Sequence, residues 1–242
     1  MQVQWRLLIA CGGLAFWAQS AAGLQLTTEE YPPFNMRELK SGAEVLSGVS
    51  VDKVRELMRR AQQSYQINLY PWTRAYQLAL VHDDSCVFST TRTPEREALF
   101  KWVGPLVQNN WTVFARADDK RRPHKFEDLK PYVMGGYQTD AVGEYLKLQG
   151  LQVDLAASDS DNLRKLLSKR FDYWATGELA GHWLIKSHQL QGKIVPLFNF
   201  RHTSMYLACN IKMPQDKITQ WNAILREMER DGTVEAIEKK YR

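Results

Sequence analysis

Strand-like and helix-like segments alternate twice along this chain, once on each side of a polar, basic stretch at 117–125. Such alternation is typical of α/β folds, in which helices cover a largely parallel sheet. Before the stretch we expect strands at 24–28, 67–70 and 86–90 and helices at 50–62 and 73–81. After it we expect strands at 132–135, 153–156 and 172–175 and helices at 140–149, 161–168 and 179–186. The sequence therefore predicts an α/β fold with two lobes.

The C-terminal part of the chain is expected to return to the first lobe. A strand at 205–210 precedes two amphipathic helices, the first of which carries Ile218, Trp221 and Leu225 on one face. In open α/β sheets, the strand ends and the helix starts that follow them face the ligand site. We therefore expect a ligand to bind between the two lobes.

An arginine stands where a helix would ordinarily avoid a cation. In the segment 91–97, Thr93 has the character of a helix N-cap, a proline follows it, and Arg96 falls in the first turn. A cation there opposes the positive end of the helix dipole, unless an anion binds at the same place. One interpretation is an anion-binding corner. The other is a surface ion pair of Arg96 with Glu95, Glu97 or another carboxylate.

Aromatic residues next to turns are further candidates for the ligand site. Tyr31, Phe34 and Trp72 stand at junctions between strands and helices, and Trp174 stands near the end of a predicted strand, next to turn residues. Core packing is an equally good interpretation for each, since aromatic side chains are commonly buried. Together with Arg96 they would form an aromatic box, suited to a small molecule with a carboxylate and a cation held over ring faces.

Two carboxylates of the second lobe could hold a ligand ammonium. Asp140 follows Thr139 at the start of a predicted helix, and Glu178 follows a predicted strand. Helix capping is the better interpretation of Asp140.

Several classes of site are excluded by the sequence. It has no glycine-rich phosphate loop, no dinucleotide fingerprint, no zinc-spaced cysteines and no serine-nucleophile elbow. The five histidines are scattered, and the net charge of +5 is too mild to indicate nucleic-acid binding. We expect neither a cofactor nor a metal ion.

The first 22 residues are expected to be a secretory signal peptide. Arg6 precedes an apolar run from Leu7 to Ala18, and small residues follow at 20–22. The run is too short to span a bilayer, which takes about 20 residues. A lipoprotein anchor at Cys11 is the alternative that we disfavour, because almost no apolar run would precede the cleavage. The expected location is the periplasm.

The mature chain keeps two cysteines, Cys86 and Cys209, far apart in sequence and each in an apolar run. Free buried thiols are the interpretation we favour, and a disulfide is the alternative in an oxidising compartment.

In their order and spacing, motifs along the whole mature chain resemble the periplasmic solute-binding proteins of family three, the polar amino-acid binders of ABC importers. The motifs are Tyr31-Pro32-Pro33-Phe34, Gly48-Val49-Ser50-Val51-Asp52, Tyr70-Pro71-Trp72-Thr73-Arg74-Ala75, Thr91-Arg92-Thr93-Pro94-Glu95-Arg96-Glu97, Trp102-Val103-Gly104-Pro105 and the ending from Trp221 to Thr233.

The resemblance implies a Venus-flytrap fold of two lobes with a two-strand hinge. Lobe one would comprise 23–113 and 207–242, and lobe two would comprise 114–206. The hinge strands would lie near 111–116 and 205–210.

The resemblance also implies roles for particular residues. Arg96 would hold the ligand α-carboxylate with Thr91 as its hydroxyl partner, and Ser89 is a further candidate. The aromatic after the first strand would be Tyr31 or Phe34. The second-lobe contacts fall on the turn at 138–141, which contains Thr139.

The chain departs from the family pattern in lobe two. The aspartate that holds the α-ammonium in amino-acid binders aligns with Gly177, beside Glu178, and Gly135-Gly136-Tyr137 replaces the usual Gly-Thr-Thr-like step. Glu178 could take over the role, or the ligand is not a standard α-amino acid.

We therefore expect a monomeric, non-enzymatic binding protein that captures a small carboxylate-bearing ligand, an amino acid or a derivative, for an inner-membrane ABC permease. An alternative from another class is a periplasmic dehydratase of prephenate-like acids, with Glu178 as general acid. A stand-alone sensor is a third.

Overall fold

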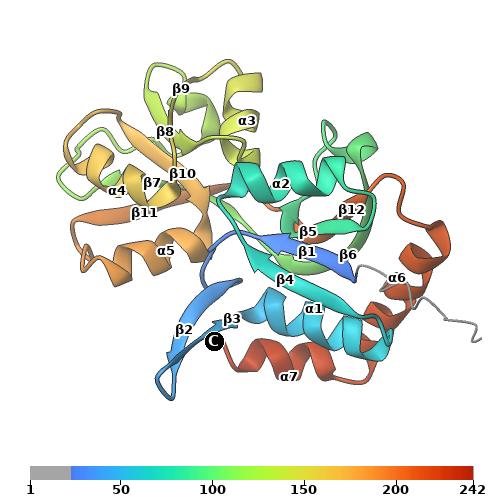
Figure 1. Ribbon diagram of the computed structural model, residues 1–242. Helices are drawn as coiled ribbons and strands as arrows, with labels where there is room; N and C mark the ends of the chain where they lie inside the picture. Colours follow the sequence, from blue (N-terminus) through green and yellow to red (C-terminus); the bar gives the residue numbers. More distant parts are fainter. Residues whose placement is uncertain (1–22, 242) are drawn as a thin grey trace, which may run out of the picture.

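Two five-stranded sheets lie side by side in the computed structural model, which describes residues 23–241 (Figure 1). The first sheet has the order β4 (Tyr65–Leu69), β1 (Leu24–Thr28), β5 (Ser85–Thr91), β12 (Ser204–Asn210) and β6 (Phe100–Gln108). The second has the order β11 (Ile194–Arg201), β7 (Trp111–Arg116), β10 (Tyr173–Gly177), β8 (Val133–Tyr137) and β9 (Gln152–Ala156). The predicted α/β fold in two parts is confirmed.

Both sheets follow one plan. In the first, β4, β1 and β5 are parallel, and β12 runs antiparallel to both β5 and β6. In the second, β9, β8 and β10 are parallel, and β7 runs antiparallel to both β10 and β11. The sheets are therefore mixed rather than largely parallel.

The chain passes between the sheets twice, at Asn109-Asn110 and at His202-Thr203. Two hydrogen bonds join the passages. The backbone amide of Asn109 donates to the carbonyl of Thr203 at 2.8 Å, and the Thr203 hydroxyl donates to the carbonyl of Asn109. The strands expected at the hinge are β7 and β12, each of which lies within one sheet. The passages precede the lobe limits expected at 113 and 206 by a few residues.

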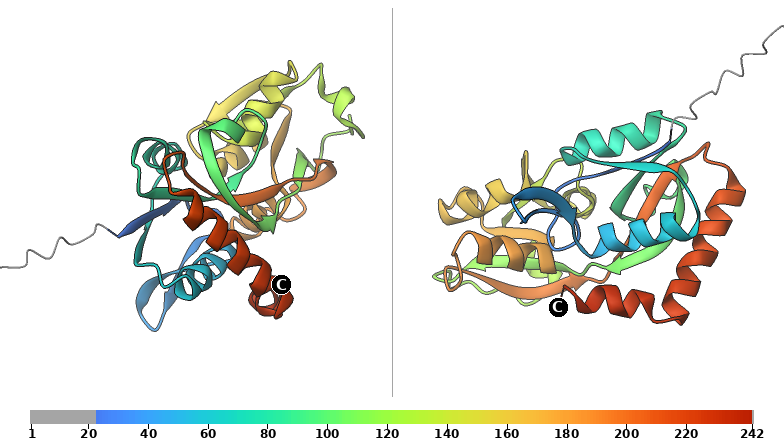
Figure 2. Two further views of the ribbon diagram at one scale, coloured as in Figure 1. Left: turned by 90° about the vertical axis from the view of Figure 1, so that its right-hand side faces the viewer. Right: turned by 60° about the horizontal axis from the view of Figure 1, so that its bottom comes forward.

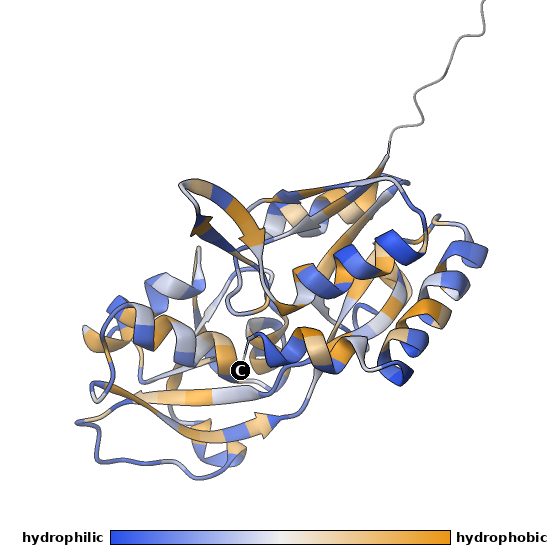
Figure 3. Ribbon diagram, turned by 90° about the horizontal axis from the view of Figure 1, so that it is seen from below, coloured by the Kyte–Doolittle hydropathy of each residue, from blue (hydrophilic) through white to orange (hydrophobic). Residues whose placement is uncertain are grey.

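Helices cover both faces of each sheet. On the first sheet, α1 (Val49–Arg60) and α6 (Gln215–Arg230) share one core, with α7 (Thr233–Lys239) beside them, and α2 (Trp72–Val81) packs on another. On the second, α3 (Ala141–Leu148) lies in one core, and α4 (Asp159–Leu167) and α5 (Glu178–Ser187) lie in the other. The return of α6 and α7 to the first part is visible in Figure 2, and hydrophobic residues follow particular sides of the helices (Figure 3).

The remaining elements are short. A hairpin of β2 (Met36–Lys40) and β3 (Ala43–Ser47) is separate from both sheets. The two short 3₁₀ helices are η1 (Glu97–Leu99) and η2 (Phe126–Leu129). Within residues 23–241, no helix is both long enough and apolar enough to cross a membrane. The predicted signal peptide and Cys11 lie outside the described residues.

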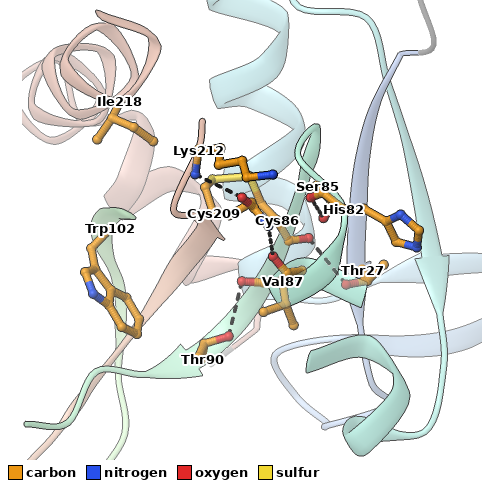
Figure 4. Close-up of a disulfide and its surroundings, with 12 residues drawn as sticks. Thr27, His82, Ser85, Cys86, Val87, Thr90, Trp102, Cys209, Lys212 and Ile218 are labelled. Carbon is orange, nitrogen blue, oxygen red and sulfur yellow. Dashed lines mark hydrogen bonds between the residues drawn. A yellow bond between two sulfur atoms is a disulfide. The ribbon is translucent and has the colours of Figure 1, made fainter. Parts of the chain in front are cut away.

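A disulfide joins Cys86 and Cys209, so the prediction of free thiols is wrong (Figure 4). The two cysteines stand opposite each other on the antiparallel strands β5 and β12, with an S–S distance of 2.07 Å. Both are fully buried. The apolar runs around them do form strands as expected, but 123 residues separate the two positions, and the runs themselves carry no sign of which strands pair.

Candidate functional site

The carboxyl ends of the central parallel strands of the two sheets meet at one place. Glu29 follows β1, and its Oε1 accepts a hydrogen bond of 2.9 Å from the hydroxyl of Tyr137, the last residue of β8. Arg96 follows β5, and its guanidinium donates to the carbonyl of Thr139, just after β8. This is the edge at which open α/β sheets bind ligands.

The predicted α-helix at Thr93 is not formed. The segment 94–96 is a turn, and η1 follows it with Arg96 as its N-cap residue. The chain re-enters a strand at Phe100, so only a single short turn fits between β5 and β6. Arg96 is nevertheless buried as the anion-site interpretation requires.

Arg96 pairs with a carboxylate of the second part, that of Glu144 on α3. Its Nη2 donates to Oε2 of Glu144 at 2.7 Å and to the carbonyl oxygen of Thr139 at 2.8 Å. Among the residues that the structure describes, Nε of Arg96 has no hydrogen-bond partner. A surface pair with Glu97 is excluded, because that carboxylate binds the neighbouring Arg92.

Aromatic rings surround the guanidinium of Arg96. Its central carbon lies 5.1 Å from the ring centre of Tyr76 and 6.0 Å from that of Trp72. The indole of Trp72 also donates to the carbonyl of Thr139 at 2.9 Å, and the hydroxyls of Thr73 and Thr139 lie 3.1 Å apart. The structure thus brings together three of the predicted site residues, namely Trp72, Arg96 and Thr139.

The other two aromatics of the predicted box lie elsewhere. Tyr31 stacks on Phe34 with ring centres 5.5 Å apart, and Phe34 is part of the first sheet's core. The Tyr31 hydroxyl reaches the second sheet at Gly177, where a Cβ atom would lie 2.3 Å from it and 2.5 Å from Oδ1 of Asn109. Only glycine fits there without displacing these side chains.

Ser89 and Thr91 lie near the end of β5. The Ser89 hydroxyl donates to Oδ1 of Asn35 at 2.5 Å, within the first part of the structure. Thr91 is buried and pairs with Met205 of β12.

The second-sheet candidates Trp174 and Glu178 are held away from Arg96. The buried indole of Trp174 donates to Asp159 at 2.6 Å and packs in the core under α4 and α5. Oε2 of Glu178 accepts hydrogen bonds from the side-chain amides of Asn110, at 2.9 Å, and Asn199, at 3.2 Å. Glu178 therefore lies at a passage between the sheets.

Three carboxyl groups near this edge have raised pKa values. Burial raises the pKa of Glu29 to about 8 and that of Asp140 to about 7, although the charge of Arg96 acts in the opposite direction on Asp140. Burial raises the pKa of Asp159 to about 6 against the hydrogen bonds it accepts. Asp140 also accepts from the amide of Val142, which confirms its predicted role as a helix cap.

The sequence interpretation missed five of these residues: Glu29, Tyr76, Tyr137, Glu144 and Asp159. Tyr76 carried a signal, because it lies one helical turn after Trp72 on the same face of α2. Tyr137 and Asp159 stand at junctions of a strand with a helix, as do residues that were found, and Glu29 directly follows β1. Within residues 23–241, no group of His, Cys, Asp or Glu side chains is placed to hold a metal ion.

The raised pKa of Glu29 predicts a pH-dependent stability. The folded protein keeps this proton up to about pH 8, whereas the unfolded carboxyl loses it near its ordinary pKa of 4.5. The contribution is thus full below pH 4.5 and is lost as the pH rises through 8. In urea titrations at pH 5, 6.5 and 8, we expect Glu29→Gln to lessen the decline of the unfolding free energy by about 2–4 kcal/mol.

Asp140 and Asp159 act in the same direction, so some decline should remain in that variant. The exposed neighbour Glu30, substituted in the same way, is the matched control. A pH profile of Glu29→Gln that coincides with that of the unsubstituted protein would contradict the assignment.

Comparisons with known proteins agree with the fold. The sequence profile of the bacterial extracellular solute-binding proteins, family 3, matches residues 25–242. The chain is 23% identical over 247 aligned residues to the "Arginine-binding extracellular protein ArtP" of Bacillus subtilis (strain 168). The alignment covers 97% of this chain and 92% of that protein.

Solved structures share the fold at low identity. A histidine kinase sensor domain with similarity to periplasmic binding proteins has a TM-score of 0.82 at 18% identity, over 91% of this chain and 96% of that one. The substrate binding protein of an amino acid ABC transporter has a TM-score of 0.77 at 15% identity, over 90% and 98%. The expected two-lobed periplasmic-binding-protein fold is thereby confirmed.

Proposed function

Because this chain belongs to the bacterial extracellular solute-binding proteins of family 3, we propose that it captures an amino acid or a close derivative and delivers it to an ABC importer. It would act as a monomer in the periplasm after removal of residues 1–22. Support for the ligand class comes from the relative named as arginine-binding, and support for the importer comes from the related binding protein of an amino acid ABC transporter.

One observation carries the proposal: a buried guanidinium at the meeting edge of the two sheets already binds a carboxylate. The side chain of Arg96 is only 3% exposed, and Nη2 reaches Oε2 of Glu144 across the boundary. Charge-assisted hydrogen bonds of this kind are the strong ones, and guanidinium geometry matches a planar carboxylate. The same position would hold the carboxylate of an amino acid.

Closure of the two parts around the ligand would follow from the paired passages between the sheets. The hydrogen bonds between Asn109 and Thr203 join the passages, and the Glu178 carboxylate accepts from Asn110 beside them. We propose that these passages are the hinge and that the parts they connect are the two lobes. Few residues need to change conformation in such a motion.

The proposed ligand contacts extend the list expected from the sequence. Arg96 would hold the carboxylate, with Trp72 and Tyr76 against its guanidinium and Thr139 and Asp140 facing it from the second lobe. Tyr31 would act at the edge of the site, beside Gly177. We assign Trp174 and Glu178 supporting roles, through Asp159 and the hinge respectively.

A panel of L-amino acids, with prephenate included, tests the proposed function. At a ligand concentration of about a hundred times Kd, binding should stabilise the protein by about 2.7 kcal/mol and raise Tm by roughly 5–10 °C. Isothermal titration of the best ligand, with its D-isomer as control, should give one site per chain. A panel without any binder would contradict the ligand class, and consumption of prephenate would establish the enzyme alternative.

A further inference from the structure

Protein groups themselves join the two parts at the site. Glu29 with Tyr137, Trp72 and Thr73 with Thr139, and Arg96 with Glu144 each connect the first part to the second. Only the last of these contacts is an ion pair. In this contact, unlike the others, the carboxylate of Glu144 occupies the position on Arg96 where the proposed function places the ligand carboxylate.

The two members of this ion pair differ in how much they depend on it. The Arg96 side chain is 3% exposed, whereas the Glu144 side chain is 47% exposed and stands in the first turn of α3. A buried guanidinium that loses its anion is strongly destabilised, but a half-exposed carboxylate regains water when it turns away. Arg96 therefore requires a carboxylate, and Glu144 can give up its place.

Space on the guanidinium is also limited. Nη2 already donates to both Glu144 and the carbonyl of Thr139, while the rings of Trp72 and Tyr76 lie within 6.0 Å and 5.1 Å of its central carbon. A ligand carboxylate that binds Nη2 must take over the position of Glu144 Oε2. It could then use Nε as well, which has no partner among the described residues.

We propose that Glu144 is an internal counter-ion of Arg96 that a ligand carboxylate displaces, so that ligand capture is an exchange of one carboxylate for another. This inference rests on the proposed function. Glu144 thereby sets the affinity, because every ligand must compete with it. Glu144 also sets specificity. After its displacement it stays near Arg96, and its negative charge repels a ligand that carries a second carboxylate close to the one that Arg96 binds.

The substitution Glu144→Gln tests this role, since it keeps the size of the side chain and removes its charge. L-Arginine is the probe for binding by isothermal titration. We expect the variant to bind it about tenfold more tightly, the equivalent of about 1.4 kcal/mol of lost competition. Small-angle scattering in buffer without amino acids should show a larger radius of gyration, because one contact between the lobes is weakened.

The matched control is Glu97→Gln, because Glu97 also forms a short ion pair with an arginine, Arg92, but on the first part alone. It should change neither readout. Weaker arginine binding by Glu144→Gln would overturn the proposal, because Glu144 would then be a ligand contact, and unchanged affinity and scattering would overturn it as well. If arginine binds neither the unsubstituted protein nor the variants, arginine is excluded as the ligand and the binder found in the amino-acid panel replaces it as the probe. The scattering comparison decides in either case whether Glu144 holds the lobes together.

Discussion

Arg96→Ala is expected to weaken binding of the ligand found in the amino-acid panel by about a hundredfold or more. A buried charged hydrogen-bond partner typically contributes about 2–5 kcal/mol when only one side of the pair is removed. The ligand carboxylate would keep its burial but lose the cation that compensates for it. Titration calorimetry on the variant measures the loss directly.

Two further variants make the Arg96 experiment specific. Arg92→Ala removes a guanidinium four positions earlier that pairs with Glu97 and lies over Trp102 and Tyr206, and it should leave ligand affinity unchanged. Arg96→Lys keeps the charge without the planar fork and should give an intermediate loss.

Folding of Arg96→Ala can be checked by circular dichroism. Its former partner Glu144 is half exposed and tolerates the change. Wild-type affinity in the folded alanine variant would exclude Arg96 from the ligand site.

Replacing both Cys86 and Cys209 with alanine is expected to lower the free energy of unfolding by about 3–5 kcal/mol. The bond joins positions 123 residues apart, so it restricts a long loop of the unfolded chain. Both side chains are fully buried in adjacent strands, and alanine leaves the hydrogen bonds between β5 and β12 intact. Urea unfolding of the oxidised protein and the variant gives the difference.

Reductant supplies the control for the disulfide. Dithiothreitol should bring the unsubstituted protein towards the stability of the double variant and should leave the variant itself unchanged. Equal unfolding free energies for the oxidised protein and the variant would show that this cross-link does not stabilise the fold.

Sequence patterns predicted most of the elements but not their pairing. Apolar segments predicted the inner strands of both sheets and the helices α1 to α7, but they gave no expectation for the edge strands β6 and β11 or for the hairpin of β2 and β3. The pairing of β5 with β12, on which the disulfide depends, joins segments more than a hundred residues apart. No local pattern near Cys86 or Cys209 distinguishes a strand neighbour from any other buried strand.

At the candidate site as well, the local sequence predicted some residues, whereas others depend on how distant segments pack together. The unusual charge at Arg96 pointed to a buried anion site, and the guanidinium is indeed buried, although the helix on which the argument began does not form. Glu144 escaped notice because its role depends on how α3 faces the loop after β5. Trp174 was taken as a site residue because it is an aromatic residue close to a predicted turn, but its side chain packs in the core formed with α4 and α5.

Position 177 sets how closely the two halves of this molecule can approach. A single hydrogen atom there leaves room for the tip of Tyr31 and for Asn109, which would otherwise lie within 2.5 Å of a methyl carbon. A larger residue would act as a wedge between Tyr31 of the first part and β10 of the second, beside the passage at Asn109. If the two passages are the hinge that we propose, a small obstruction beside them displaces the far ends of the two halves by a larger distance. The contact of Arg96 with Glu144 would then depend on the absence of a side chain at position 177.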